Sequence, residues 1–172
     1  MPKIIENLKE KLLLEARRQV EEFGYAKTTI RSIASACGVG TGTVYNYFPS
    51  KDMLIASFMV EDWKGCLAEM SSCEDKDPES FLKNVCGCLE RFIKLHSRLF
   101  YDKDAAASFS LAFSARHAQL RSQISGVIAP VCSGIGRDDL FFREFAAEAL
   151  LSWTSEGKSF EELWSVIGRL FV

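Results

Sequence analysis

Small residues and a proline interrupt an otherwise helical sequence between residues 33 and 54, in the segment IASACGVGTGTVYNYFPSKDML. Gly38 follows one short stretch with helical periodicity, and Pro49 follows a second, at residues 41–47. Glycine adopts the positive φ that a tight turn requires, and the residue before a proline disfavours the helical region. Two short helices joined by a glycine-containing turn form a helix-turn-helix. The segment therefore predicts this motif within a helical fold.

The remainder of the chain also follows a helical period. Apolar residues recur at steps of three and four from Ile5 to Phe23, and Gly24 is placed to end that helix. Either Thr28 or Thr29 caps the short helix that follows. Further helices, with a short one between residues 97 and 108, are expected over residues 50–72, 78–96, 109–131, 140–155 and 160–171, with caps at Ser50, Asp77, Asp138 and Ser159. Since no segment alternates with the period of a strand, we predict an all-α fold of eight or nine helices.

The composition is that of a soluble globular protein. Of the 172 residues, 48% are hydrophobic and 26% are charged, which is not typical of a disordered chain. Charged residues interrupt every apolar run near the N-terminus, so a signal peptide is not expected. No uncharged apolar span is long enough to cross a bilayer. We therefore expect a cytoplasmic protein with no membrane partner.

Basic residues are concentrated near the N-terminus. Residues 1–51 hold eight Lys or Arg and five Glu, whereas the rest of the chain holds 13 basic and 18 acidic side chains. No acidic residue lies between Lys27 and Lys51. Although the net charge of the whole chain is −2, this distribution is compatible with nucleic-acid binding at one end.

The six cysteines match no zinc-binding spacing. In a cytoplasmic chain they are expected to be reduced, and their simplest role is that of small buried apolar residues. The alternative is a redox- or metal-responsive regulator, for which Cys86 and Cys88 are the best sensor candidates. No nucleophile motif surrounds a cysteine or involves His96 or His117, so we expect neither an enzyme nor a bound metal or cofactor.

Four short motifs between residues 28 and 54 resemble the DNA-binding domain of the tetracycline-repressor (TetR/AcrR-type) family of bacterial transcriptional regulators. They are TTIRSIA, GV, GTVYNYF and SKDML, and their spacing is that of the family. Gly40 and Cys37 depart from the family pattern, which more often has serine and alanine there. The resemblance implies a three-helix DNA-binding domain over residues 1–52 and a helical effector-binding and dimerisation domain over residues 53–172.

The DNA-contacting residues follow from helix-turn-helix geometry and from the resemblance. The N-terminus of the second short helix enters the major groove, where Thr41, Gly42 and Thr43 would meet the bases. Tyr45 and Tyr47 point about 200° apart on a helix, so they cannot share one role. The family pattern implies that Tyr45 lies at the groove and that Tyr47 reaches a phosphate.

Residues that flank this helix complete the expected contact set. Lys51 begins the next helix, where its charge and the free N–H groups favour a phosphate. Thr28, Thr29 and Arg31 face the other side of the groove, and Asn46 faces solvent or a phosphate. Packing roles for the two tyrosines, and solvated roles for Lys51 and Arg31, are the competing interpretations.

Useful affinity for DNA requires two copies of so small an interface. The last two predicted helices carry more apolar surface than one small domain covers, and in the family the corresponding helices form a four-helix bundle between two subunits. Such a homodimer implies a palindromic operator in double-stranded DNA. The competing interpretation is that these helices belong to the core of one chain. The expected interface residues are Phe141, Phe145, Ala149, Trp153, Leu163, Ile167 and Leu170.

The middle of the chain is rich in aromatic and aliphatic residues. In the family, this region encloses a small and often lipophilic effector, whose binding releases the DNA. Ordinary core packing is the competing interpretation for each residue. The candidate pocket residues are Trp63, Leu67, Phe81, Val85, Leu89, Phe92, Phe100, Phe109 and Phe113. The sequence thus predicts a ligand-responsive regulator, most simply a repressor, whose effector it does not identify.

Overall fold

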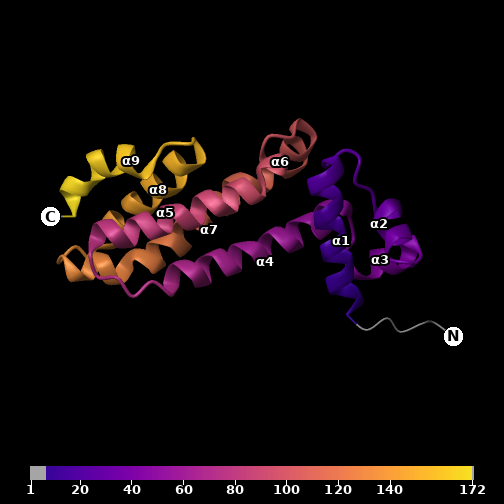
Figure 1. Cartoon of the computed structure of the whole chain (residues 1–172), viewed down its shortest axis with the longest axis horizontal. Helices are drawn as coiled ribbons and strands as arrows, with labels where there is room; N and C mark the ends of the chain where they lie inside the picture. Colours follow the sequence, from indigo (N-terminus) through magenta and orange to yellow (C-terminus); the bar gives the residue numbers. More distant parts are fainter. Residues whose placement is uncertain (1–6, 172) are drawn as a thin grey trace. The chain divides into compact units, whose positions relative to one another are not determined.

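The computed structural model describes residues 7–171, apart from the side chains of residues 109–115 (Figure 1). In that part of the chain the backbone forms nine α-helices and one 3₁₀ turn, with no strand, which confirms the all-α prediction. The elements are α1 (Leu8–Phe23), α2 (Ile30–Ala36), α3 (Thr41–Tyr47), α4 (Lys51–Ser71), α5 (Pro78–Leu95), α6 (Ser97–Phe100), α7 (Lys103–Gly134), α8 (Leu140–Ser155), α9 (Phe160–Ile167) and η1 (Gly168–Leu170). None of the described helices is long and apolar enough to span a membrane.

Local sequence signals account for the first three helices. α1 ends at Gly24, which has a φ of 84°. Thr29 is the residue that caps α2: its hydroxyl oxygen accepts the Ser32 N–H at 3.0 Å, and the Ser32 hydroxyl accepts the Thr29 N–H at 3.1 Å. Gly38 adopts a φ of 68° in the turn between α2 and α3. The predicted helix-turn-helix is therefore confirmed, with a capping box at its start.

α7 is longer than predicted at both ends. It begins at Lys103 and not near residue 109, because the Asp102 carboxylate accepts two backbone N–H groups of the first turn at 2.9 and 3.0 Å. It continues to Gly134, beyond the predicted end at Val131. Asp102 therefore marks the start of α7, which the apolar periodicity alone did not indicate.

A second difference concerns the cap of α8, for which the sequence has two neighbouring aspartates. The predicted cap of α8, Asp138, is wrong, because it is Asp139 that accepts the Phe142 N–H, at 2.8 Å. Ser159 caps α9 as predicted, in a capping box with Glu162. The last predicted helix divides into α9 and η1.

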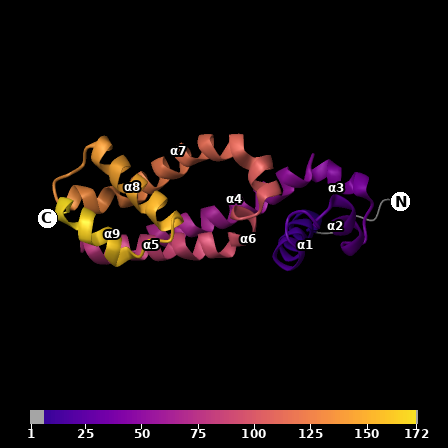
Figure 2. The same cartoon turned by 90° about the horizontal axis from the view of Figure 1, so that it is seen from above.

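The described residues form two compact units. The first comprises residues 7–62 and 96–110, and the second comprises residues 63–95 and 111–171. Within the second unit, α8 packs along α5, and α9 contacts both helices (Figures 1 and 2). These units are defined by packing, and the functional boundary expected after residue 52 stays a prediction.

Each unit has its own apolar core. The first core combines residues of α1, α2 and α3 with the first half of α4 and with α6, and its most deeply buried members include Leu12, Ile33, Val44, Leu54 and Phe58. The second core includes Leu82, Leu89, Ile124, Ile128 and Leu150. Because α4 and α6 contribute to the first core, the three N-terminal helices do not enclose an apolar interior alone.

A partly buried polar cluster accompanies the first core. The Asp62 carboxylate binds the Arg17 guanidinium through two contacts and lies 3.0 Å from His96 Nε2. Phe58 contacts both partners of Asp62, with the His96 ring stacked at 6.0 Å and the Arg17 guanidinium 5.2 Å from its centre. Burial lowers the pKa of His96, and Arg17 adds to this effect while Asp62 opposes it. His96 is therefore neutral at physiological pH.

Protonation of His96 is expected to weaken the fold. The unfolded histidine has a pKa of about 6.5, so below that pH the unfolded chain binds more protons than the folded one. The contribution of neutral His96 to the free energy of unfolding is fully present above this pH. It is lost as the pH decreases toward the lower pKa of the folded state. His96→Gln keeps an N–H donor for Asp62 but does not titrate. Its melting temperature should therefore fall less than that of the wild type between about pH 7 and pH 5.

The control for this pH series is Ser57→Ala, which removes a hydroxyl that donates to the Met53 carbonyl at 2.7 Å and does not titrate in this range. This variant should keep the pH dependence of the wild type. Identical melting curves of His96→Gln and wild type at every pH would contradict the assignment.

Candidate nucleic-acid interface

α3 is anchored by one face and exposed on the other. Val44 is wholly buried, and Phe48, directly after the helix, is almost so. Thr41, Gly42, Tyr45, Asn46 and Tyr47 are exposed, and Thr43 is half-buried. A helix of seven residues held by two apolar side chains leaves its N-terminus and most of its circumference open, as a recognition helix requires.

Three helix ends meet at one depression of about 520 Å³. Its walls come from the start of α2, from α3 and from the start of α4. Six of the ten expected DNA-contacting residues line it: Thr28, Thr29, Arg31, Thr41, Tyr45 and Lys51. The other four expected residues, Gly42, Thr43, Asn46 and Tyr47, are not part of its lining. Tyr45 and Tyr47 are thus placed at different surfaces, as their angular separation requires.

Thr28 is a correction to the expected contact set. Its side chain is wholly buried, and its hydroxyl donates to the Gly24 carbonyl at 2.9 Å. The residue borders the depression, but a hydroxyl committed to the end of α1 does not reach DNA. The hydroxyl oxygen of the neighbouring Thr29 is bound in the α2 cap. Thr29 can therefore contact DNA through its exposed surface but not through a hydrogen bond of this oxygen.

Tyr25, which no local sequence pattern indicated as a site residue, holds Lys51 in place. The Lys51 ammonium nitrogen lies 3.0 Å from the Tyr25 carbonyl oxygen and 3.5 Å above the centre of the Tyr25 ring. Burial lowers the pKa of Lys51, and nearby carboxylates, first of all Asp52, oppose this effect. A loop tyrosine after a helix-ending glycine carries no distinctive local pattern, so only the three-dimensional contact reveals it.

The expected effector residues do not form one group. Phe81, Val85 and Leu89 are buried in the core of the second unit, where Trp63 packs edge-on against Phe92 at 5.2 Å. Leu67 is partly buried against the same core. A depression of about 480 Å³ at the ends of α4, α5 and α7 has only Phe81 of this set in its lining.

Phe100 is a further correction, because it packs against the core of the first unit and edge-on to His96 at 6.3 Å. The pocket that was expected to include it therefore contains residues of two separate cores. Phe109 and Phe113 lie outside the described side chains.

The expected dimer residues separate into two groups. On α8, Phe141 is 79% exposed, and Phe145 and Trp153 are about half exposed, with Ala149 half-buried between them. Leu163 and Ile167 are instead buried, and Leu170 is half-buried against the same core. Leu163 and Ile167 of α9 are therefore corrections to the expected interface, because their side chains cover the core of their own unit. The place of Leu170, in η1, at an interface stays a prediction.

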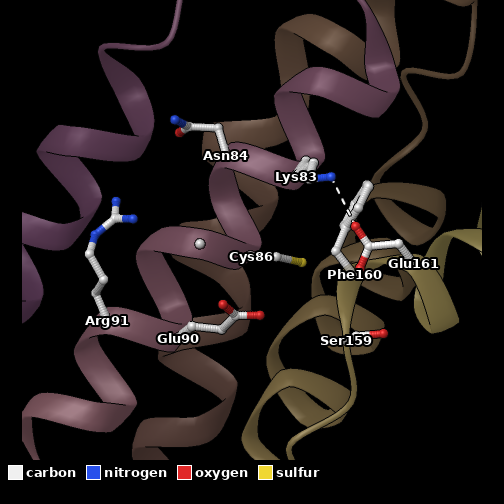
Figure 3. A pocket seen from close by; sticks show the side chains of 9 residues that line it. Lys83, Asn84, Cys86, Glu90, Arg91, Ser159, Phe160 and Glu161 are labelled. Atoms are coloured by element: carbon white, nitrogen blue, oxygen red, sulfur yellow. Dashed lines mark hydrogen bonds and ion pairs between the residues drawn. The ribbon is translucent and has the colours of Figure 1, made fainter.

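Four of the cysteines are buried. Cys86 lines a depression of about 400 Å³ between α5 and the start of α9, across which Lys83 and Glu161 form an ion pair of 2.9 Å (Figure 3). Burial raises the pKa of Cys66 to about 12 and the pKa values of Cys86 and Cys132 to about 11. Burial also raises the pKa of Cys88. These thiols are protonated at neutral pH, and within the described residues no three potential ligands gather at a metal site.

Comparison with known proteins bears on the first third of the chain. Residues 12–58 match the family described as bacterial regulatory proteins, tetR family. The HTH-type transcriptional regulator YerO of Bacillus subtilis, itself uncharacterized, is 32% identical over 83 residues, which cover 46% of this chain and 29% of YerO. The HTH-type transcriptional repressor Rv1474c of Mycobacterium tuberculosis is 35% identical over 66 residues, 36% of this chain and 35% of that protein. The match thus spans about a third of the length of these curated relatives.

Solved structures extend the likeness of the fold to nearly the whole chain. A TetR-family transcriptional regulator from Syntrophomonas wolfei superposes with a TM-score of 0.63 at 18% identity, over 96% of this chain and 93% of that one. FadR, a fatty acid degradation regulator from Bacillus halodurans, superposes with a TM-score of 0.57 at 17% identity, over 98% and 96% of the two chains. Fold and site together define a protein with an N-terminal helix-turn-helix domain. Residues 12–58 carry the sequence pattern of the tetR family of bacterial regulatory proteins, and the fold of nearly the whole chain resembles that of the two solved regulators.

Burial predicts a graded reactivity of the six thiols. Cys37 and Cys73 are partly exposed, whereas the others are buried. At neutral pH, a small thiol reagent should label these two more than about tenfold faster than the other four in the folded protein. Mass spectrometry of samples quenched over time measures the order of labelling, and unfolding in denaturant should make all six equivalent. Early labelling of Cys86 or Cys88 would contradict the prediction and favour a thiol sensor.

Proposed function

We propose that the chain is a transcriptional repressor that binds a palindromic DNA operator as a homodimer and releases it when a small lipophilic effector binds. The observation that carries the DNA-binding part is the depression at which the start of α2, the exposed face of α3 and the start of α4 meet. It holds two basic side chains and no acidic one, which suits the negative charge of a duplex.

The proposed contacts divide between bases and phosphates. Thr41, Gly42 and Thr43 are at the N-terminus of α3, so they approach base edges, and Tyr45 extends from the next turn. Tyr47 is exposed away from the depression and reaches a phosphate. Arg31 and Lys51 supply the positive charge on either side, Asn46 contributes polar surface, and Thr29 contributes van der Waals contact. Phosphate contacts fix the register, whereas the α3 contacts specify sequence.

The homodimer is supported by the exposed face of α8. Phe141, Phe145 and Trp153 recur at steps of four and eight residues, so they lie on one stripe of the helix. A contiguous stripe of exposed aromatic residues marks an interaction surface, and a two-fold interface requires a patch that pairs with itself. A second copy of α8 satisfies this requirement.

The effector part is supported by the composition of the second unit. Its core is built from aromatic and aliphatic side chains around Trp63, Phe81 and Phe92, with the Trp63 indole N–H donated to Gln123 at 2.8 Å. A site that opens within such a core would favour an apolar ligand with a few polar groups.

DNA binding is tested by selection of sites from a random duplex pool, followed by titrations at several salt concentrations. The selected site should be an inverted repeat. Arg31→Ala should weaken binding and reduce the slope of log K against log salt by about one, since one phosphate contact is lost. Arg169→Ala, which removes an exposed arginine of η1, is the matched control and should keep the wild-type slope. Selection without an inverted repeat, or equal slopes for Arg31→Ala and wild type, would exclude the assigned interface.

Dimerisation is tested by Phe141→Glu. A charge within an apolar interface is expected to convert the dimer to a folded monomer, because each copy would bury a carboxylate. Tyr101→Glu is the control, since Tyr101 has nearly the same exposure, 77%, but is not on α8. Sedimentation measures the mass, and circular dichroism verifies the helical content. A wild-type monomer, or a dimer that Phe141→Glu leaves intact, would rule out this surface.

A further inference from the structure

Tyr25, in the loop between α1 and α2, is almost completely buried, and its contacts include Lys51, Asp52 and Ser108. Its carbonyl oxygen and its ring both hold the Lys51 ammonium, at 3.0 Å and 3.5 Å. Its phenol oxygen lies 2.5 Å from Asp52 Oδ1 and 2.9 Å from Ser108 Oγ. One loop residue therefore contacts both the first turn of α4 and an early turn of α7.

The hydrogen bonds of the phenol have one consistent arrangement of protons. A phenol has a single proton and a carboxylate only accepts, so Tyr25 donates to Asp52. The Ser108 hydroxyl then donates to the phenol oxygen. Burial, with the hydrogen bond to Asp52, raises the pKa of Tyr25, so the phenol keeps its proton at neutral pH. Bonds to an ionised partner are the stronger kind, and this one is partly shielded from water.

Lys51 connects this arrangement to the DNA-facing depression. An ammonium has three N–H donors; the Tyr25 carbonyl accepts one and the Tyr25 ring faces another, so one remains for a phosphate. Arg31, Thr41 and Tyr45 line the same depression from α2 and α3. A displacement of Tyr25 would therefore move the Lys51 charge relative to the residues that approach the bases.

We propose that Tyr25 is a positioning residue for operator recognition, which orients Lys51 and links the start of α4 to Ser108 of α7. The proposal rests on the proposed DNA-binding function and adds the residue that sets its geometry. Residues 103–110 of α7 belong to the same compact unit as α1, α2 and α3. A shift of Ser108 thus reaches the start of α4 through two consecutive hydrogen bonds, and operator affinity depends on the place of these first turns of α7.

The test uses Tyr25→Phe, Ser108→Ala and the double variant in the full chain. These changes remove phenol hydrogen bonds without altering the net charge. Each single variant should bind the selected operator about fivefold more weakly, and the double variant should be no weaker than Tyr25→Phe. Affinity for a scrambled duplex and its salt dependence should stay unchanged, because no cation is lost.

The matched control is Ser57→Ala, because the Ser57 hydroxyl donates within α4 to the Met53 carbonyl at 2.7 Å. It should bind the operator as the wild type does. Unchanged operator affinity of Tyr25→Phe, or equal losses on operator and scrambled duplex, would overturn the positioning role. Additive losses in the double variant would overturn the link to Ser108. A wild-type chain that selects no operator would overturn the proposed function, and this inference with it.

Discussion

The recognition helix depends on a core that the first three helices do not complete. Val44 and Phe48 share that core with Leu54 and Phe58 of α4 and with Leu99 of α6. A unit of about 60 residues buries only about 60% of the surface that its unfolded chain exposes, so added apolar cover matters greatly at this size. The cover comes from a stretch of sequence beyond α5. The surface proposed to face DNA is therefore supported, in part, by residues 96–110.

Two polar clusters fix this stretch to the N-terminal helices. Near its start, His96 shares the Asp62 carboxylate with Arg17 of α1. Near its end, Ser108 shares the Tyr25 phenol with the start of α4. A buried polar group that loses its partner costs more than the bond contributes when it is made, so such clusters permit few alternative arrangements. Under the proposed function, an effector that shifts this stretch would keep both clusters or break them, which favours two discrete states over a graded response.

Sequence signals that act within one helical turn predicted most of the fold. Burial that depends on residues far apart in the sequence could not be predicted in this way. Thr28 and Thr29 have the same capping chemistry, and only the backbone decides that Thr29 caps α2 while Thr28 is buried. Apolar periodicity places Phe141 and Leu163 on apolar faces, but it does not say whether the same chain or another copy covers them. Helix α3 could be predicted because the signals that define it lie within a few residues of it. Tyr25 was not, because its phenol partners lie 27 and 83 residues away in the sequence.

α8 is apolar on two faces, and only one is used within the chain. Ala147 and Leu150 face the core of their own unit, while Phe141 and Trp153 stay exposed. The exposed stripe leaves aromatic surface in contact with water, so a second copy that covered it would be favoured by the hydrophobic effect. If a second copy covers it, one dimer carries two α3 helices, and the second half-site is then bound at a high effective concentration. Operator affinity would then depend on protein concentration near the dimer dissociation constant. A substitution on α8 would consequently weaken operator binding without changing any group that touches DNA.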